Sequence, residues 1–135
     1  MCCALLVAFT QHLLGCSGTP IVGYQKDGTY ILERSEHGLD CLRLSQNLWG
    51  RIELLKAMPA KAAKEQQDTP PNAMLAMGRW FGAPGKGLKA VEDYDRERAH
   101  ALALHGAMAQ KRCLTHDIER ELTQSDAAMA QFRRP

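Results

Sequence analysis

A cysteine with a histidine and an aspartate nearby is the first group in the chain whose residue types could do covalent chemistry. Cys41 follows His37 by four residues, and Asp40 stands directly before it. A thiol becomes a good nucleophile when a base, a cation or a helix N-terminus lowers its pKa. Gly38 lies between the histidine and the cysteine and leaves their geometry open. We expect Cys41 on an apolar helix face and predict that the chain is not an enzyme; a small thiol enzyme is an alternative.

Histidines in the C-terminal half could instead bind a metal ion together with a second cysteine. Cys113 and His116 are three residues apart, and His100 and His105 precede them. A zinc site needs about four ligands at one point, whereas His105 and His116 on a single helix would lie roughly 16 Å apart. Only a chain reversal near Thr115 would bring them together. The sequence therefore predicts no metal site, no cofactor and no loss of fold with a chelator.

Residues 69–91 combine cations, aromatic rings and glycines without any acidic residue. The glycine-rich part, 82–87, lacks the preceding glycine and the following hydroxyl residue of a phosphate-binding loop, so we interpret it as a loop between helices. Cations beside stackable rings suit single-stranded RNA, which makes a small ribonucleoprotein subunit an alternative function. The candidate RNA-contacting residues are Arg79, Trp80, Phe81, Lys86 and Lys89.

Composition bounds the class of protein. The chain has 135 residues, of which 45% are hydrophobic and 24% charged, and this balance is typical of one folded domain. A net charge of only +2 argues against a dense positive surface for nucleic acid. Five irregularly spaced cysteines do not resemble a disulfide framework, so we expect reduced thiols and favour a reducing intracellular compartment or an organelle matrix. No run reaches the roughly 18 apolar residues that a transmembrane helix needs.

The N-terminal segment, residues 2–16, is apolar and has three interpretations. No Lys or Arg precedes Lys26, which departs from a signal peptide, so we expect the segment to be retained as a buried helix. Its ending LLGC, residues 13–16, resembles the lipobox of bacterial lipoproteins, in which the cysteine is lipidated after cleavage. Residues 17–20 would then form a tether, and the chain would be a lipid-anchored envelope protein. A mitochondrial presequence is the third interpretation.

The remaining patterns predict a mainly α fold with one small hairpin. Two runs with β-branched and aromatic residues, 20–25 and 29–34, flank Asp27-Gly28, a strong hairpin signal. A helix is expected over 39–58, because apolar residues recur there every three or four positions. Its stripe consists of Leu44, Leu48, Ile52, Leu55 and Met58, broadened by Trp49.

A double proline, Pro70-Pro71, marks the best internal boundary, between 1–68 and 69–135 of one domain. A short helix is expected over 72–81. From 88 to 134 there is no proline, which predicts either one long helix or a helical hairpin, and we favour the long helix.

A single long helix could not bury its apolar stripe against so small a body, and the stripe would then face a partner. The residues predicted to bind that partner are Ile118, Leu122, Met129 and Phe132. The leading function is therefore a non-catalytic accessory or assembly subunit that docks by amphipathic helices onto a larger protein assembly or onto a second copy of itself.

Overall fold

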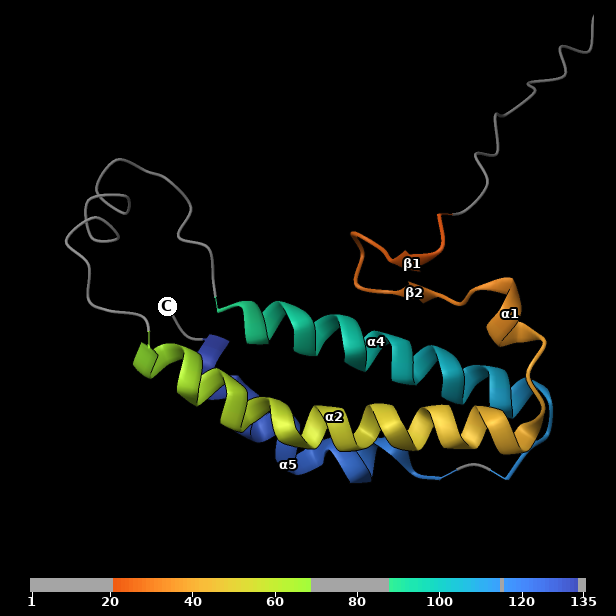
Figure 1. Ribbon diagram of the computed structural model, residues 1–135. Coiled ribbons are helices and arrows are strands. Elements are labelled where there is room, and N and C mark those ends of the chain that lie inside the picture. The colour runs from red at the N-terminus through yellow and green to blue at the C-terminus, as the bar shows by residue number, and fades with distance from the viewer. Residues whose placement is uncertain (1–20, 69–87, 115, 134–135) are drawn as a thin grey trace, which may run out of the picture.

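A computed structural model describes residues 21–68, 88–114 and 116–133 and confirms the mainly α prediction (Figure 1). Most of this chain lies in three long helices: α2 (Cys41–Asp68), α4 (Lys89–Gln110) and α5 (Ile118–Ala130). The short elements are strands β1 (Gly23–Tyr24) and β2 (Tyr30–Ile31), helix α1 (Arg34–His37) and the 3-10 turn η1 (Gln131–Arg133).

Helix α2 follows the predicted apolar stripe and runs past its proline. All five predicted stripe positions are buried, and Ala62 extends the stripe by one more turn. Pro59 lies inside the helix, where it removes one backbone hydrogen bond. Burial of Met58 before it and Ala62 after it offsets that loss. The helix therefore continues to Asp68, just before the double proline.

Between α4 and α5 the chain reverses, so the favoured long helix is wrong and the alternative, a helical hairpin, is correct. The end of α4 is a Schellman motif: the amide of Arg112 donates to the carbonyl of Ala109 at 3.0 Å, and the amide of Cys113 donates to that of Met108 at 3.0 Å. Arg112 adopts a φ of 57°, a left-handed conformation that glycine usually supplies at this position. The motif ends the helix and turns the chain back.

Helix α5 begins at Asp117, whose carboxylate accepts a hydrogen bond from the backbone amide of Arg120 at 3.1 Å. This side chain is the N-cap and satisfies one of the free amides of the first turn. Glu119 and Glu121 in that turn complement the positive end of the helix dipole. The sequence before α5 thus carries a start signal in Asp117, whereas no glycine marks the end of α4.

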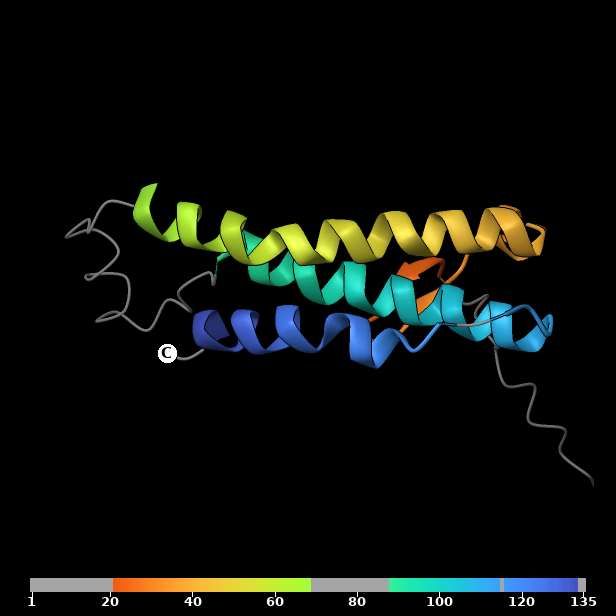
Figure 2. The same cartoon turned by 90° about the horizontal axis from the view of Figure 1, so that it is seen from below.

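The three long helices lie side by side and alternate in direction, as Figures 1 and 2 show. Helix α2 packs mainly against α4 on one side and α5 on the other. Ion pairs join the helices at the surface: Arg51 of α2 contacts Glu97 of α4, and Lys56 of α2 contacts Glu121 of α5 at 3.0 Å. Between the helices lies one apolar core that includes Leu48, Ile52, Leu55, Tyr94, Leu104, Met108 and Leu122.

The predicted N-terminal hairpin is present and lies against α4, on the side away from α2 (Figure 1). Its strands are shorter than expected, with Gly23 opposite Ile31 and Tyr24 opposite Tyr30. The turn forms at the predicted Asp-Gly, where Gly28 has a φ of 83°. The Asp27 carboxylate accepts hydrogen bonds from the backbone amide and hydroxyl of Thr29 at 3.0 and 2.7 Å.

Several sequence predictions fall outside the described residues. These are the three interpretations of the N-terminal segment, the helix over 72–81, the loop over 82–87 and the boundary at Pro70-Pro71. Among the helices that are described, none has the length and apolar character to cross a membrane.

Candidate functional site

The cysteine singled out as a potential nucleophile is oxidised. Cys41, the first residue of α2, and Cys113, just after α4, form a disulfide with a Cα–Cα distance of 5.6 Å. The expectation of reduced thiols is therefore wrong for this pair. Asp40 is also engaged, because its carboxylate accepts a hydrogen bond from the backbone amide of Arg43 at 2.8 Å. A sulfur in this bond has no thiolate with which to attack a substrate.

The disulfide lies where the chain changes direction. Cys113 directly follows the left-handed Arg112, and Lys111 donates a hydrogen bond from Nζ to the carbonyl of Leu39 at 2.7 Å. The bond and this hydrogen bond hold the end of α4 against the segment that enters α2. Neither contact was predicted from the sequence, since the two cysteines meet only after the chain reverses.

The residues considered as metal ligands do not converge. Cys113 is in the disulfide, and the ring of His116 meets Trp49 edge-on with 5.0 Å between centroids. The described residues contain no group of three or more histidines, cysteines or carboxylates placed to hold a metal ion.

His100 of α4 is buried, with 4% of its surface exposed, and connects the hairpin to the bundle. Its Nε2 lies 2.6 Å from a carboxylate oxygen of Glu36 in α1. Its ring stacks on Tyr30 of β2, with 3.9 Å between centroids and 9° between planes. The second Glu36 oxygen accepts a hydrogen bond from the Glu33 amide at 3.0 Å, so this carboxylate fixes α1 as well. These contacts hold the hairpin in one orientation on α4.

The residues predicted to bind a partner lie mainly in the core. Ile118, Leu122 and Met129 are buried in the bundle, and Phe132 is partly buried against it. The reason is the chain reversal, which folds α5 back onto α2 and covers the stripe. In this structure the stripe is not an exposed docking face.

Of the candidate RNA-contacting residues, only Lys89 is described. It begins α4, and its Nζ lies 2.7 Å from the Asp93 carboxylate. Arg79, Trp80, Phe81 and Lys86 lie outside the described residues.

A cluster of cations surrounds Asp93, which is buried with 6% of its surface exposed. Lys89 and Lys61 contact one carboxylate oxygen at 2.7 and 3.1 Å, and Arg96 contacts the other at 2.8 Å. The hydrogen bond from Lys89 is the largest cause that lowers the pKa of Asp93, to about 2. Beside this cluster, Glu65 of α2 caps α4 by accepting the amides of Lys89 and Ala90 at 2.7 and 2.9 Å. The arrangement joins the C-terminal end of α2 to the N-terminal end of α4.

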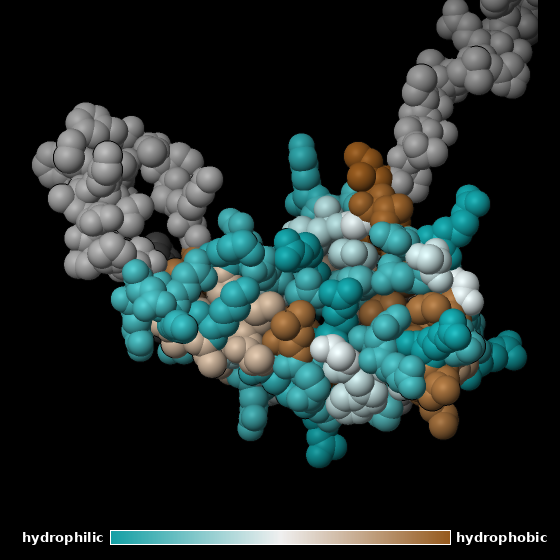
Figure 3. All heavy atoms as spheres, viewed as in Figure 1, coloured by the Kyte–Doolittle hydropathy of each residue, from teal (hydrophilic) through white to brown (hydrophobic). Residues whose placement is uncertain are grey.

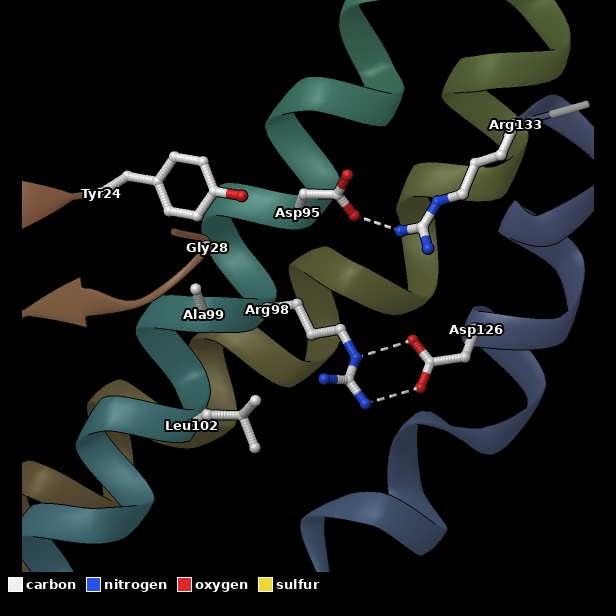
Figure 4. Close-up of a pocket in the computed structure, with 8 residues that line it drawn as sticks. All are labelled: Tyr24, Gly28, Asp95, Arg98, Ala99, Leu102, Asp126 and Arg133. Carbon is white, nitrogen blue, oxygen red and sulfur yellow. Dashed lines mark hydrogen bonds and ion pairs between the residues drawn. The ribbon is translucent and has the colours of Figure 1, made fainter. Parts of the chain in front are cut away.

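A shallow pocket of about 390 Å³, which we name the charged cleft, lies where the hairpin, α4 and α5 meet (Figure 4). Arg98 and Asp126 form two parallel hydrogen bonds at 2.9 and 3.0 Å, and Asp95 pairs with Arg133. Tyr94 donates its hydroxyl to Asp126 at 2.6 Å. Burial, and then this hydrogen bond to a carboxylate, raise the pKa of Tyr94.

Asp126 is held ionised in this cleft. Burial favours its protonated form, but the hydrogen bonds from Arg98 and Tyr94 outweigh burial and lower its pKa. The acidic and basic groups of the cleft therefore engage one another and connect α4 to α5, which suits a structural role better than proton transfer to a substrate.

Comparison of the chain with known protein families, characterised proteins and solved structures finds no match. The functional conclusion therefore depends on the chemistry of the chain itself. The feature with the clearest consequence is the disulfide between Cys41 and Cys113.

Proposed function

We propose that the chain is a non-catalytic, lipid-anchored envelope protein whose helical bundle stands at the outer side of a membrane. The observation that carries this proposal is the disulfide between Cys41 and Cys113. Structural disulfides persist in oxidising compartments such as the bacterial periplasm and are rare in the cytosol. The disulfide removes the reason for favouring a reducing compartment. It favours the alternative of a lipoprotein in the oxidising bacterial envelope.

The sequence supplies the anchor. Residues 13–16, LLGC, resemble the lipobox of bacterial lipoproteins, and the resemblance implies that Cys16 is lipidated. The polar residues 17–20 would then connect the lipid to the first described residue, Ile21. The stretch before Cys16 departs from a typical signal peptide in having no Lys or Arg, so the anchor has to be tested directly.

A non-catalytic role is supported by how the polar groups are used. The thiols of Cys41 and Cys113 are joined, Asp93 binds three cations, and Asp126 binds Arg98 and Tyr94. Each of these groups connects helices to one another. A rigid bundle of this kind suits an accessory protein that contacts a larger assembly, with its contacts made by exposed side chains rather than by the buried α5 stripe.

The experiment is to replace Cys16 in the native cell and follow the membrane fraction. Cys16→Ser should release the protein from membranes or leave it unprocessed, and intact mass of the wild type should show a chain that begins at Cys16 with a diacylglycerol increment. Cys3→Ser is the matched control, since this cysteine lies outside the LLGC sequence, and it should leave anchoring unchanged. A wild-type protein that begins at Met1 without lipid would contradict the proposal.

A further inference from the structure

Three of the six large apolar side chains that are exposed among the described residues lie at the start of the hairpin. Ile21 is 79% exposed and Val22 49%, and Tyr24 in β1 is 43% exposed. We name these three residues the hairpin patch. In Figure 3, brown side chains project from the upper surface where the described chain begins. The other three lie on other elements: Leu42 and Leu54 on α2, and Leu114 after α4. Leu42 and Leu114 directly follow the two disulfide-bonded cysteines.

Several backbone groups at the start of the hairpin are already hydrogen-bonded. The Gln25 side-chain amide donates to the carbonyls of Ile21 and Gly23 at 2.5 and 2.8 Å. The Gln25 backbone amide donates to the Thr29 carbonyl at 2.9 Å. A backbone group that already has a partner loses less when it leaves water. These hydrogen bonds lower the cost of moving this part of the hairpin into a less polar environment.

The position of the patch is fixed relative to the bundle. Tyr30, paired with Tyr24 across the hairpin, stacks on the buried His100 of α4. Since the hairpin and α4 form one unit, whatever binds the patch also sets the orientation of the three helices.

The chain before the patch limits how far it can lie from the proposed anchor. Four residues lie between Cys16 and Ile21, and the five Cα–Cα steps of a fully extended chain span at most about 18 Å. A lipidated Cys16 lies at the bilayer surface, so the apolar side chains nearest to it in sequence are held beside that surface. Aromatic residues with a polar end, such as Tyr24, are favoured at the same boundary.

We infer that the hairpin patch docks on the lipid headgroup and upper acyl region of the bilayer that holds the anchor, so that the hairpin side of α4 faces the membrane. The inference rests on the proposed lipid anchor. Residues 21–24 are both close to Cys16 along the chain and rich in exposed apolar surface. Leu42, Leu54 and Leu114 are exposed too, but they lie outside this segment. The hairpin thereby gives the anchored bundle one fixed orientation.

A tryptophan probe at the patch tests the inference. Ile21→Trp is made in a Trp49→Phe, Trp80→Phe background, and the full-length protein purified from native membranes is reconstituted in vesicles of phosphatidylethanolamine and phosphatidylglycerol. We expect the emission of the probe to shift to shorter wavelength. We also expect it to lose intensity when the acyl chains are brominated. Circular dichroism checks that the bundle is intact.

Leu54→Trp in the same background is the matched control. Helix α2 lies on the opposite side of α4 from the hairpin, so this probe should stay in water and keep its emission in brominated lipid (Figure 1). Equal quenching at both positions, or none at Ile21→Trp, would overturn the inference. An Ile21→Trp probe that is buried only in native membranes, and not in pure lipid, would assign the patch to a protein partner instead. Intact mass of the same sample distinguishes the two proposals when the Ile21→Trp probe is not quenched. If Cys16 carries no lipid, the proposed anchor is wrong. If Cys16 carries lipid, only the proposed docking is wrong.

Discussion

The two ends of the bundle are closed by different chemistry. At one end a disulfide joins Cys41, at the start of α2, to Cys113 after α4. At the other end, Glu65 caps α4 and Asp93 binds cations from both helices. A covalent bond depends on the redox state and not on salt, whereas ion pairs depend on pH and are screened by salt. The ends should therefore respond to different changes in solution, and this difference can be tested end by end.

The largest effect is expected from the covalent end. Replacing both Cys41 and Cys113 with Ser opens a loop whose ends are 72 residues apart. The chain-entropy model predicts a loss of about 4 kcal/mol in the free energy of unfolding. Urea denaturation measures it. A reductant should lower the stability of the wild type by a similar amount and leave the double variant unchanged. Equal stability of the wild type and the double variant would contradict a stabilising role of the disulfide.

At the ionic end, Asp93→Asn should have the next largest effect. The buried carboxylate would become neutral while Lys61, Lys89 and Arg96 remain around it, and charged hydrogen bonds of this kind contribute about 1 to 3 kcal/mol. Asp95→Asn is the control, because Asp95 has one partner, Arg133, and both side chains are well exposed. We expect thermal unfolding to show a clear loss for the first variant and little change for the second.

The cations around Asp93 also predict how the stability of the folded state depends on pH. The folded pKa of Asp93 is about 2, below the usual value for a carboxyl group, so its ionised form stabilises the folded state. That contribution is complete above the unfolded pKa, near 4, and is lost as the pH falls through 2. The stability difference between wild type and Asp93→Asn should therefore be constant at neutral pH, shrink below pH 4 and disappear below pH 2. A difference that persists below pH 2 would assign the effect to packing.

The smallest effect is expected at the cap. Glu65→Ala removes the acceptor of the Lys89 and Ala90 amides, and the loss of a helix cap costs about 1 kcal/mol. Glu92→Ala is the control, since Glu92 lies in the same first turn of α4, complements the helix dipole and has no hydrogen bond or ion pair within the described residues. Hydrogen exchange of the first turn of α4 should increase for the Glu65 variant and change less for the control.

The sequence predicts local elements well because their signals are local. The Asp27-Gly28 turn and the stripe of α2 depend on residues within a few positions of one another, and both predictions are confirmed. The reversal after α4 was the less favoured of the two alternatives because its left-handed position is held by Arg112, where a glycine would have signalled the end of the helix. A helix stop without glycine has little signature in the sequence.

The site depends on contacts between residues that are distant in sequence, and local patterns do not predict which of them meet. Cys41 and Cys113 meet only when α4 runs back along α2, and α5 buries Leu122 only when the chain turns again. The preference for one long helix turned a core stripe into an expected docking face. Asp93 gave no signal either, because Lys61 comes from another helix, 32 residues away.

The most direct test of the account is the oxidation state of Cys41 and Cys113 in the native cell. Cells are quenched in acid, free thiols are alkylated, and the protein is digested without reduction for mass spectrometry. We expect a cross-linked pair of peptides containing Cys41 and Cys113, with neither cysteine alkylated. Recovery of both cysteines as separate alkylated peptides would contradict the oxidising compartment, and with it the proposed place of the protein in the envelope.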